Sequence, residues 1–180
     1  MESDRLWAPW RLGYVQGNEA AEAVDEPAHW RPGADRTCFL CRAASATGHE
    51  RSLGVLERTA ASLVVVNRFP YSNGHLLVAP LAHKATLTSL TGAETLDLQD
   101  RIAFWCDTIA ATMQAKGFNI GLNLGSVAGA GLPGHLHWHI VPRWPGDVNF
   151  MATVAGARVL PQALDSLWEQ LAAAATKEAP

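Results

Sequence analysis

The chain has 180 residues, of which 48% are hydrophobic and 17% charged, a composition that is typical of a globular domain and excludes a disordered chain. The formal net charge is −3 and no broad basic stripe exists, which excludes a nucleic-acid duplex as the expected partner. No apolar run approaches the roughly 18 residues of a membrane span, and the first residues lack the apolar core of a signal peptide. We therefore expect a cytoplasmic protein without membrane contact, whose three cysteines are reduced.

Residues 1–36 are predicted to form an N-terminal segment and a surface loop, ahead of a single domain over residues 37–180. The segment begins with the aromatic residues Trp7, Trp10 and Tyr14, which rarely stay exposed without a reason. They could cover the domain's own core or face a partner subunit. The acidic stretch that follows has few large apolar residues, as expected for a loop.

The predicted domain opens with a Cys-x-x-Cys pair, Cys38 and Cys41. This spacing suits two thiolates on one tetrahedral metal ion, usually zinc. A redox pair is disfavoured, because no helical pattern starts cleanly after the second cysteine. A zinc site would need two more ligands, and the candidates are His49, His83 and His135. The alternative is a pair of ordinary reduced thiols.

Five strands and two helices are predicted in the rest of the chain. A helix after Thr91 has capping-box spacing, an apolar stripe that includes Cys106, and an expected end at Gly117. One antiparallel sheet, with this long helix between its third and fourth strands and a C-terminal helix, indicates an α+β fold. The expected strands are residues 53–57, 62–67, 75–80, 118–123 and 135–141, and the final helix spans residues 161–176.

Three histidines, His135, His137 and His139, alternate with apolar residues in the stretch His-Leu-His-Trp-His-Ile-Val over residues 135–141. Alternation predicts a half-buried strand with the imidazoles on one face and the apolar side chains on the other. At about 3.3 Å per residue, the outer imidazoles would be rooted roughly 13 Å apart, so the three should divide their tasks. They could be structural residues, ligands of a catalytic metal, or the site of a histidine nucleophile. The metal is disfavoured because no carboxylate follows before Asp147.

This stretch resembles the defining motif of the histidine triad (HIT) family, and the resemblance covers roughly residues 5–165. The opening Arg-Leu-Trp-Ala-Pro-Trp-Arg, residues 5–11, and the later Asn149-Phe150 resemble a bacterial branch related to diadenosine tetraphosphate phosphorylases. The resemblance implies the HIT fold and a homodimer formed through the long helix and the sheet. Further matching blocks, in family order, are residues 66–70, 74–80, 121–125 and 141–147.

The resemblance also implies roles for the histidines. His137, the central one, would attack an α-phosphorus and form a nucleotidyl-histidine, while its other ring nitrogen donates to a main-chain carbonyl. His139 would donate to the phosphoryl oxygens, and His75 would sit beside His137 and tune its charge. In related members with the same cysteine pair, the equivalents of Cys38, Cys41, His83 and His135 close a Cys2His2 zinc site.

The nucleotide site implied by the resemblance places Asn67 at the ribose and Asn123 near the phosphates. Each has an alternative, since Asn67 could cap a turn and Asn123 could end its strand. Many members carry side-chain donors in the loop before the triad, whereas residues 129–134 offer none, so phosphate contacts there must come from the main chain. The residues implied at the phosphates are Gly125, Ser126, Gly131 and His139, and Arg143 could bind phosphate or pair with Asp147.

We therefore expect a nucleotidyl hydrolase or transferase that acts on a dinucleoside polyphosphate or a related adenylate. The bare loop would leave room for inorganic phosphate as acceptor, which favours a phosphorylase over a hydrolase. A non-enzymatic zinc- or nucleotide-binding interaction module is the alternative, although binding alone would not need His137. A metallohydrolase with metal in the triad is a third class, which metal-free turnover would exclude.

Overall fold

The structure is a computed structural model that describes residues 26–147 and 162–178, and every structural statement below concerns these residues. The aromatic segment at residues 5–15 lies outside them. Of the expected N-terminal unit, residues 26–36 are described, and they form turns with no helix or strand. Trp30 in this stretch packs against the domain core, so the surface loop is anchored to the domain there.

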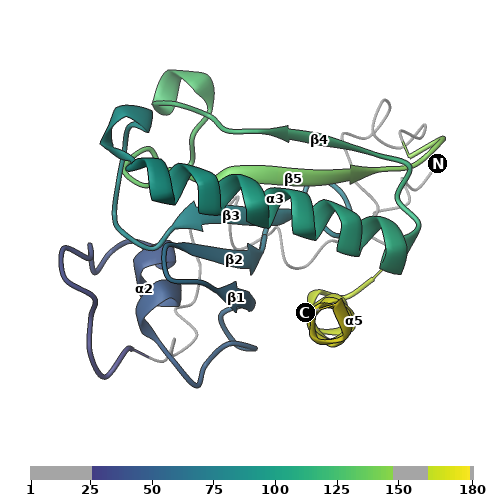
Figure 1. Ribbon diagram of the computed structural model, residues 1–180, viewed down its shortest axis with the longest axis horizontal. Coiled ribbons are helices and arrows are strands. Elements are labelled where there is room, and N and C mark those ends of the chain that lie inside the picture. The colour runs from purple at the N-terminus through teal and green to yellow at the C-terminus, as the bar shows by residue number, and fades with distance from the viewer. Residues whose placement is uncertain (1–25, 148–161, 179–180) are drawn as a thin grey trace, which may run out of the picture.

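A five-stranded antiparallel sheet lies at the centre of the molecule, in the strand order β1-β2-β3-β5-β4 (Figure 1). It confirms the antiparallel sheet expected from the sequence. Strands β2 and β3 are buried throughout, whereas β4 lies at an edge and is largely exposed. The strands are β1 Val55–Arg58, β2 Ser62–Val66, β3 Leu76–Pro80, β4 Gly117–Gly121 and β5 Trp138–Arg143.

The sequence pattern predicts that the histidine-bearing strand begins at His135. In the structure this strand, β5, begins at Trp138. The reason is that the main chain before Trp138 is bonded elsewhere: the N–H of Leu136 donates to the carbonyl oxygen of Lys84 at 2.6 Å. An amide used in this way cannot join the ladder with β4. Only the third histidine, His139, therefore lies on the strand itself.

The long helix α3, Gly92–Met113, starts as predicted. The Thr91 side chain accepts from the N–H of Glu94, and the Glu94 side chain accepts from the N–H of Thr91, which is a complete capping box. The helix ends earlier than the expected Gly117, because Gln114 adopts the left-handed conformation with φ 56°. This turn lets the chain reverse and enter β4 directly at Gly117.

Helices α3 and α5, Leu164–Glu178, pack on one face of the sheet (Figure 1). The C-terminal helix expected from the sequence is thereby confirmed. We call the cluster between the two helices and the sheet the α3–α5 core. Its buried members include Val66, Leu76, Val78 and Ile140 from the sheet and Trp105, Ile109, Leu167 and Leu171 from the helices.

A short helix that the sequence did not predict, α2, spans Phe39–Ser45 and has Cys38 as its N-cap. It corrects the expectation that no helix follows the cysteine pair. Four of its residues are buried, so it lacks the polar face that would reveal a helical period. It helps to form a second cluster, the α2 core, which includes Leu40, Cys41, Leu63, Val65, Leu77 and Ala79.

Two short 3-10 helices complete the described part, η1 Leu87–Ser89 and η2 Ser126–Ala128. Within the two described ranges, no helix combines the length and the apolar character needed to cross a membrane.

Candidate active site

His75 and His139 lie on the sheet face that carries the α2 core. His75 directly precedes β3, and Leu77 of β3 pairs with His139 of β5. Directly paired residues of antiparallel strands share a face, and so do residues two apart along an extended chain, such as His75 and Leu77. The two imidazoles are therefore neighbours. Trp138 and Ile140 pack on the opposite side, in the α3–α5 core. The predicted alternation of histidines and core residues is therefore confirmed along this part of the chain.

His137 is buried, with 8% of its surface exposed, and its main-chain neighbour fixes its tautomer. Its Nδ1 lies 2.8 Å from the carbonyl oxygen of His135, which confirms the expected hydrogen bond to a main-chain carbonyl. Because a carbonyl only accepts, Nδ1 carries the proton and Nε2 carries the lone pair. The lone pair of a neutral imidazole is nucleophilic, and here its position in the ring is defined.

One ring nitrogen of His139 has no hydrogen-bond partner among the described residues. Its Nδ1 lies 2.9 Å from Nε2 of His75, but its own Nε2 is buried and makes no hydrogen bond there. Burial, and to a smaller extent the nearby His137, lowers the pKa of His139 to about 4. His139 is thus uncharged at neutral pH, with one buried nitrogen available to a ligand.

His75 is fully buried and contacts His139, whereas the sequence analysis expected it beside His137. The ring of His139 is in contact with both, at centroid distances of 5.1 Å to His75 and 5.1 Å to His137. An effect of His75 on the nucleophile would therefore pass through His139. The register that pairs β3 with β5 produces this arrangement, and the sequence spacing does not contain it.

Asn67 caps the turn that leads to His75, as its alternative interpretation predicted. Its Oδ1 accepts from the N–H of Phe69 at 2.9 Å. Its Nδ2 faces the ring of His75, at 3.2 Å from Nδ1 and 3.3 Å from Nε2. The side chain thereby supports the histidine cluster, and a contact with ribose would have to be made in addition.

The loop before the triad is exposed and glycine-rich. Gly125 and Gly129 require their residue type, with φ values of 79° and 86° on either side of η2. The amides of Ala128, Gly129 and Ala130 donate to carbonyls inside the loop, so these three contribute least to a phosphate site. Ser126 and Gly131 are exposed, and Asn123, half-buried, precedes the loop.

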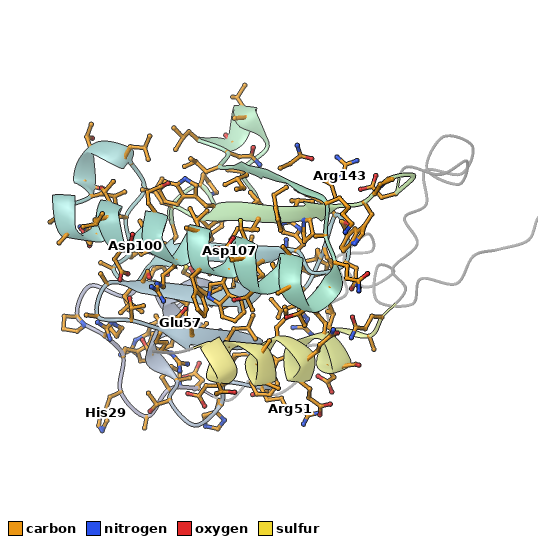
Figure 2. All side chains as sticks on the ribbon, turned by 45° about the vertical axis from the view of Figure 1, so that its right-hand side comes forward. His29, Arg51, Glu57, Asp100, Asp107 and Arg143 are labelled. Carbon is orange, nitrogen blue, oxygen red and sulfur yellow. The ribbon has the colours of Figure 1, made fainter. Side chains whose placement is uncertain are left out.

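Two basic side chains, Arg143 and Lys84, are both paired with carboxylates. Arg143 donates to both carboxylate oxygens of Asp147, at 2.5 and 2.8 Å, and to Oδ1 of Asn119 at 2.7 Å. Figure 2 shows Arg143 near the margin of the molecule. Lys84 donates to Glu94 at 2.6 Å. The pairing of Arg143 with Asp147, its alternative interpretation, is what the structure contains.

Four potential metal ligands meet beside the triad. The ligand atoms of Cys38, Cys41, His83 and His135 all lie within 4.8 Å of one another. The Sγ atoms of the cysteines approach the Nδ1 atoms of the histidines at 3.2, 3.3 and 3.6 Å. Zn–S bonds of about 2.3 Å and Zn–N bonds of about 2.0 Å, at a tetrahedral angle, separate sulfur from nitrogen by about 3.5 Å. The cluster therefore fits zinc, and the rival ligand His49 is not part of it.

The surroundings of this cluster also suit a metal. Nε2 of His135 donates to the carbonyl oxygen of Pro80 at 2.9 Å, and Nε2 of His83 lies 4.0 Å from Oδ2 of Asp35, which leaves both Nδ1 atoms to face the thiols. Burial lowers the pKa of His135 to about 4 and raises the pKa of the Cys38 thiol to about 12. The histidine thus offers a neutral ligand atom, and metal binding would have to displace the thiol proton.

Sequence reasoning missed Tyr71, which lies in the turn between β2 and β3. Its ring stacks on His139 with a centroid distance of 5.7 Å and an interplanar angle of 25°. It also lies 4.8 Å from the centroid of His75. The available signal was an aromatic residue within the turn that connects Asn67 to His75.

Comparisons with known proteins found similar sequences and similar structures. A family model described as "HIT domain" matches residues 50–146. A Mycobacterium tuberculosis protein named AP-4-A phosphorylase is 36% identical over 160 residues, covering 89% of this chain and 78% of the relative. The asymmetrical bis(5'-nucleosyl)-tetraphosphatase of Schizosaccharomyces pombe is 37% identical over 95 residues, covering 53% and 52%. A solved Zn-bound histidine triad family protein from Mycobacterium smegmatis superimposes with a TM-score of 0.57 at 25% identity, covering 68% and 84%.

Proposed function

We propose, from the premise that this chain belongs to the HIT family, that it cleaves dinucleoside polyphosphates such as diadenosine tetraphosphate through a nucleotide bound covalently to His137. It is then a HIT-type nucleotidyl hydrolase or transferase. Relatives named for both a phosphorylase and a tetraphosphatase agree with this substrate class. The finer assignment, a phosphorylase, rests on the acceptor of the second step.

In the first step, Nε2 of His137 attacks the α-phosphorus of the substrate. A P–N bond forms, and the P–O bond to the leaving nucleotide breaks with its electron pair on oxygen. The Nδ1–H of His137 donates to the carbonyl oxygen of His135 and so stabilises the positive charge that the ring acquires. For diadenosine tetraphosphate the products of this step are ATP and an AMP moiety on His137.

In the second step, an oxygen of water or inorganic phosphate attacks the same phosphorus. The P–N bond breaks and its electron pair returns to Nε2 of His137. An attacking water releases its proton to the solvent, whereas an unprotonated oxygen of phosphate has no proton to lose. Throughout, His139 would donate from Nε2 to a phosphoryl oxygen. Asn67 is proposed at the ribose, and the proposed phosphate-side contacts are Asn123, Gly125, Ser126 and Gly131.

The observation that carries this proposal is the buried Nε2 of His139, which has no partner among the described residues and lies beside a nucleophile of fixed tautomer. A buried polar atom without a hydrogen bond is costly and rare. A phosphoryl oxygen is the acceptor that would satisfy it. A protein that only bound zinc would need neither the open atom of His139 nor the oriented lone pair of His137.

Intact-protein mass spectrometry tests the covalent step. The protein is mixed with diadenosine tetraphosphate and quenched in base, where phosphoramidates survive. We expect a mass increase of one AMP moiety, which His137→Ala abolishes and the exposed control His29→Ala retains. Absence of the adduct in the wild type, with ATP nevertheless released, would exclude the covalent mechanism; absence of both would favour the non-enzymatic module.

We further propose that Cys38, Cys41, His83 and His135 hold one structural zinc ion. The ligand separations and the neutral His135 support this assignment, and the Zn-bound relative shows that the family includes zinc proteins. The ion would fix α2 to the segment that precedes β5. It takes no part in the reaction steps above, which this chain's histidines perform.

A homodimer in the cytoplasm is the remaining part of the proposal. Strand β4 is an edge strand, and the exposed apolar residues Ile120 (49% exposed), Leu124 and Val127 lie on it and beyond it. An exposed apolar edge favours pairing with a second copy. Light scattering of the wild type and of Ile120→Lys tests this. The three unpaired cysteines agree with a reducing compartment, and the boundary at residue 37 stays a prediction.

A further inference from the structure

Tyr71 has no task in the proposed reaction, yet it contacts two histidines of the site. Its main-chain N–H donates to Nδ1 of His75 at 3.0 Å. Its ring stacks on His139 at 5.7 Å and lies 4.8 Å from His75. With 48% of its surface exposed, Tyr71 covers the two imidazoles from the solvent side and is not itself a core residue. A side chain of this kind can be changed with little risk to the fold.

The N–H of Tyr71 determines where two protons lie. A main-chain N–H only donates, so Nδ1 of His75 must accept and its proton resides on Nε2. That Nε2 lies 2.9 Å from Nδ1 of His139, to which it therefore donates. Since Nδ1 of His139 accepts, the proton of His139 resides on Nε2. His139 and His137 thus hold opposite tautomers two positions apart, the former with a proton on Nε2 and the latter on Nδ1.

The groups that face His139 explain how its charge is controlled. From the segment just before its own strand it meets His137, and from the turn before β3 it meets His75 and Tyr71. Its partner on β4 is Gly121, which has no side chain. Within the described ranges the only side-chain hydrogen bond of His139 is to His75, and no carboxylate is paired with it, so a second proton on the ring would depend on water for its hydrogen bond. The burial that lowers the pKa of His139 to about 4 therefore depends on the Tyr71 ring that covers it.

We propose that Tyr71 is a positioning residue that holds His139 uncharged with its proton on Nε2, ready to donate to the reacting phosphoryl group. The main chain of Tyr71 sets the direction of the hydrogen bonds, and its ring keeps water away from the two imidazoles. The inference rests on the proposed function only where the proton on Nε2 is donated to the phosphoryl group. The tautomer and the cover are properties of the free protein.

Long-range proton–nitrogen NMR of histidine-labelled protein tests the inference without nucleotide, with His139→Gln to assign the signals. In the wild type, His139 should carry its proton on Nε2 and gain a second one only near pH 4. In Tyr71→Ala, the midpoint should rise by about one pH unit or more toward the ordinary value, because water reaches the ring. Tyr71→Phe keeps the ring and should behave as the wild type.

The pH profile of kcat/KM provides the second readout. Its acid limb should move upward in Tyr71→Ala by the same amount as the midpoint of His139, and stay in place in Tyr71→Phe. An unchanged His139 titration in a folded Tyr71→Ala overturns the inference. If that variant does not fold, the wild type still decides: a proton on Nδ1, or a midpoint near 6.5, overturns it. A missing nucleotide adduct at His137 would instead refute the proposed function and leave these spectra standing.

Discussion

The carbonyl oxygen of His135 accepts the Nδ1–H of His137 at 2.8 Å, while the imidazole of His135 belongs to the Cys2His2 cluster. One residue thus joins the candidate zinc site to the proposed nucleophile. Its ring is held by a hydrogen bond to Pro80 and its main chain holds the neighbouring ring. The cluster and the triad are therefore one connected unit, and only variants of each can separate their contributions.

His137→Ala should abolish turnover of diadenosine tetraphosphate, because the proposed mechanism forms the P–N bond at Nε2 of His137. His139→Ala should be milder, since the loss of one oriented donor costs roughly 10²–10³-fold in kcat. Steady-state kinetics with product chromatography measure both. The exposed His29→Ala is the matched control and should keep the wild-type rate. A His137→Ala protein that retained even one tenth of that rate would refute the covalent mechanism.

Purified protein prepared without chelator should contain one zinc ion per chain. Cys38→Ser should lose the metal and lower the midpoint of thermal unfolding, because the proposed ion would tie α2 to the segment before β5. Cys106→Ser is the control: this half-buried thiol packs against the α3–α5 core, and its replacement should leave the zinc content unchanged. Elemental analysis that detected no zinc in the wild type would reduce the cluster to ordinary thiols.

The zinc site can also be disturbed without replacing any of the four ligands. A Cβ atom added at Gly134 would lie 3.3 Å from Nε2 of His83, closer than ordinary contacts. Gly134→Ala should therefore displace the His83 ring and speed zinc release to a chelating dye. Gly92→Ala, where no atom lies within 4 Å of the added carbon, is the control. Equal release rates for the two variants would show that His83 does not hold the metal.

The free energy of unfolding should depend on pH through His139. Its folded pKa, lowered by burial to about 4, lies below the unfolded value of 6.5. Between these values the unfolded chain binds a proton that the folded protein does not, so stability falls as the pH drops from 6.5 to about 4. Urea unfolding at several pH values should give a flatter dependence for His139→Gln than for the wild type. Parallel curves would contradict the lowered pKa.

Local signals in the sequence were enough to predict much of the fold. The capping box of Thr91 and Glu94 fixes the start of α3, and the alternation at residues 138–140 defines the two faces of β5. These features depend on neighbouring residues alone. The helix α2 was missed because its buried residues leave no polar face to give a period, and the end of α3 was misplaced because the left-handed Gln114 carries no glycine signal.

The site was harder to predict, because it depends on which residues the sheet aligns. The motif identifies His137 and His139, but the contact of His75 with His139 follows from the register of Leu77 against His139. The engagement of Arg143 with Asn119 is also a contact between strands. Neither contact can be derived from the sequence unless the pairing register of the strands is known. The roles of side chains outside the motif therefore become visible only in the folded structure.

The acceptor of the second step distinguishes a phosphorylase from a hydrolase. With diadenosine tetraphosphate, phosphate attack on the AMP-histidine yields ATP and ADP, whereas water yields ATP and AMP. We predict that phosphorolysis is the faster reaction, because residues 129–134 before the triad carry no hydroxyl or amide side chain that could occupy the acceptor space and the M. tuberculosis relative is named as a phosphorylase. Product chromatography with and without phosphate measures the ratio. AMP as the sole second product under both conditions would make the protein a plain hydrolase.

A side chain placed in the bare loop tests the reason for this preference. Gly131 has an ordinary φ, and no atom lies within 4 Å of a Cβ added there, so Gly131→Gln should fold normally. Its amide would occupy the acceptor space, which the larger phosphate needs more than water does. The ratio of ADP to AMP should therefore fall, while ATP release in the first step stays close to the wild type. Gly92→Gln, equally free of close contacts at the start of α3, should leave the ratio unchanged. A ratio that stayed constant in Gly131→Gln would show that the loop does not select the acceptor. Arg143→Gln completes the comparison: because Arg143 is bound to Asp147 and Asn119, the KM for phosphate should not change.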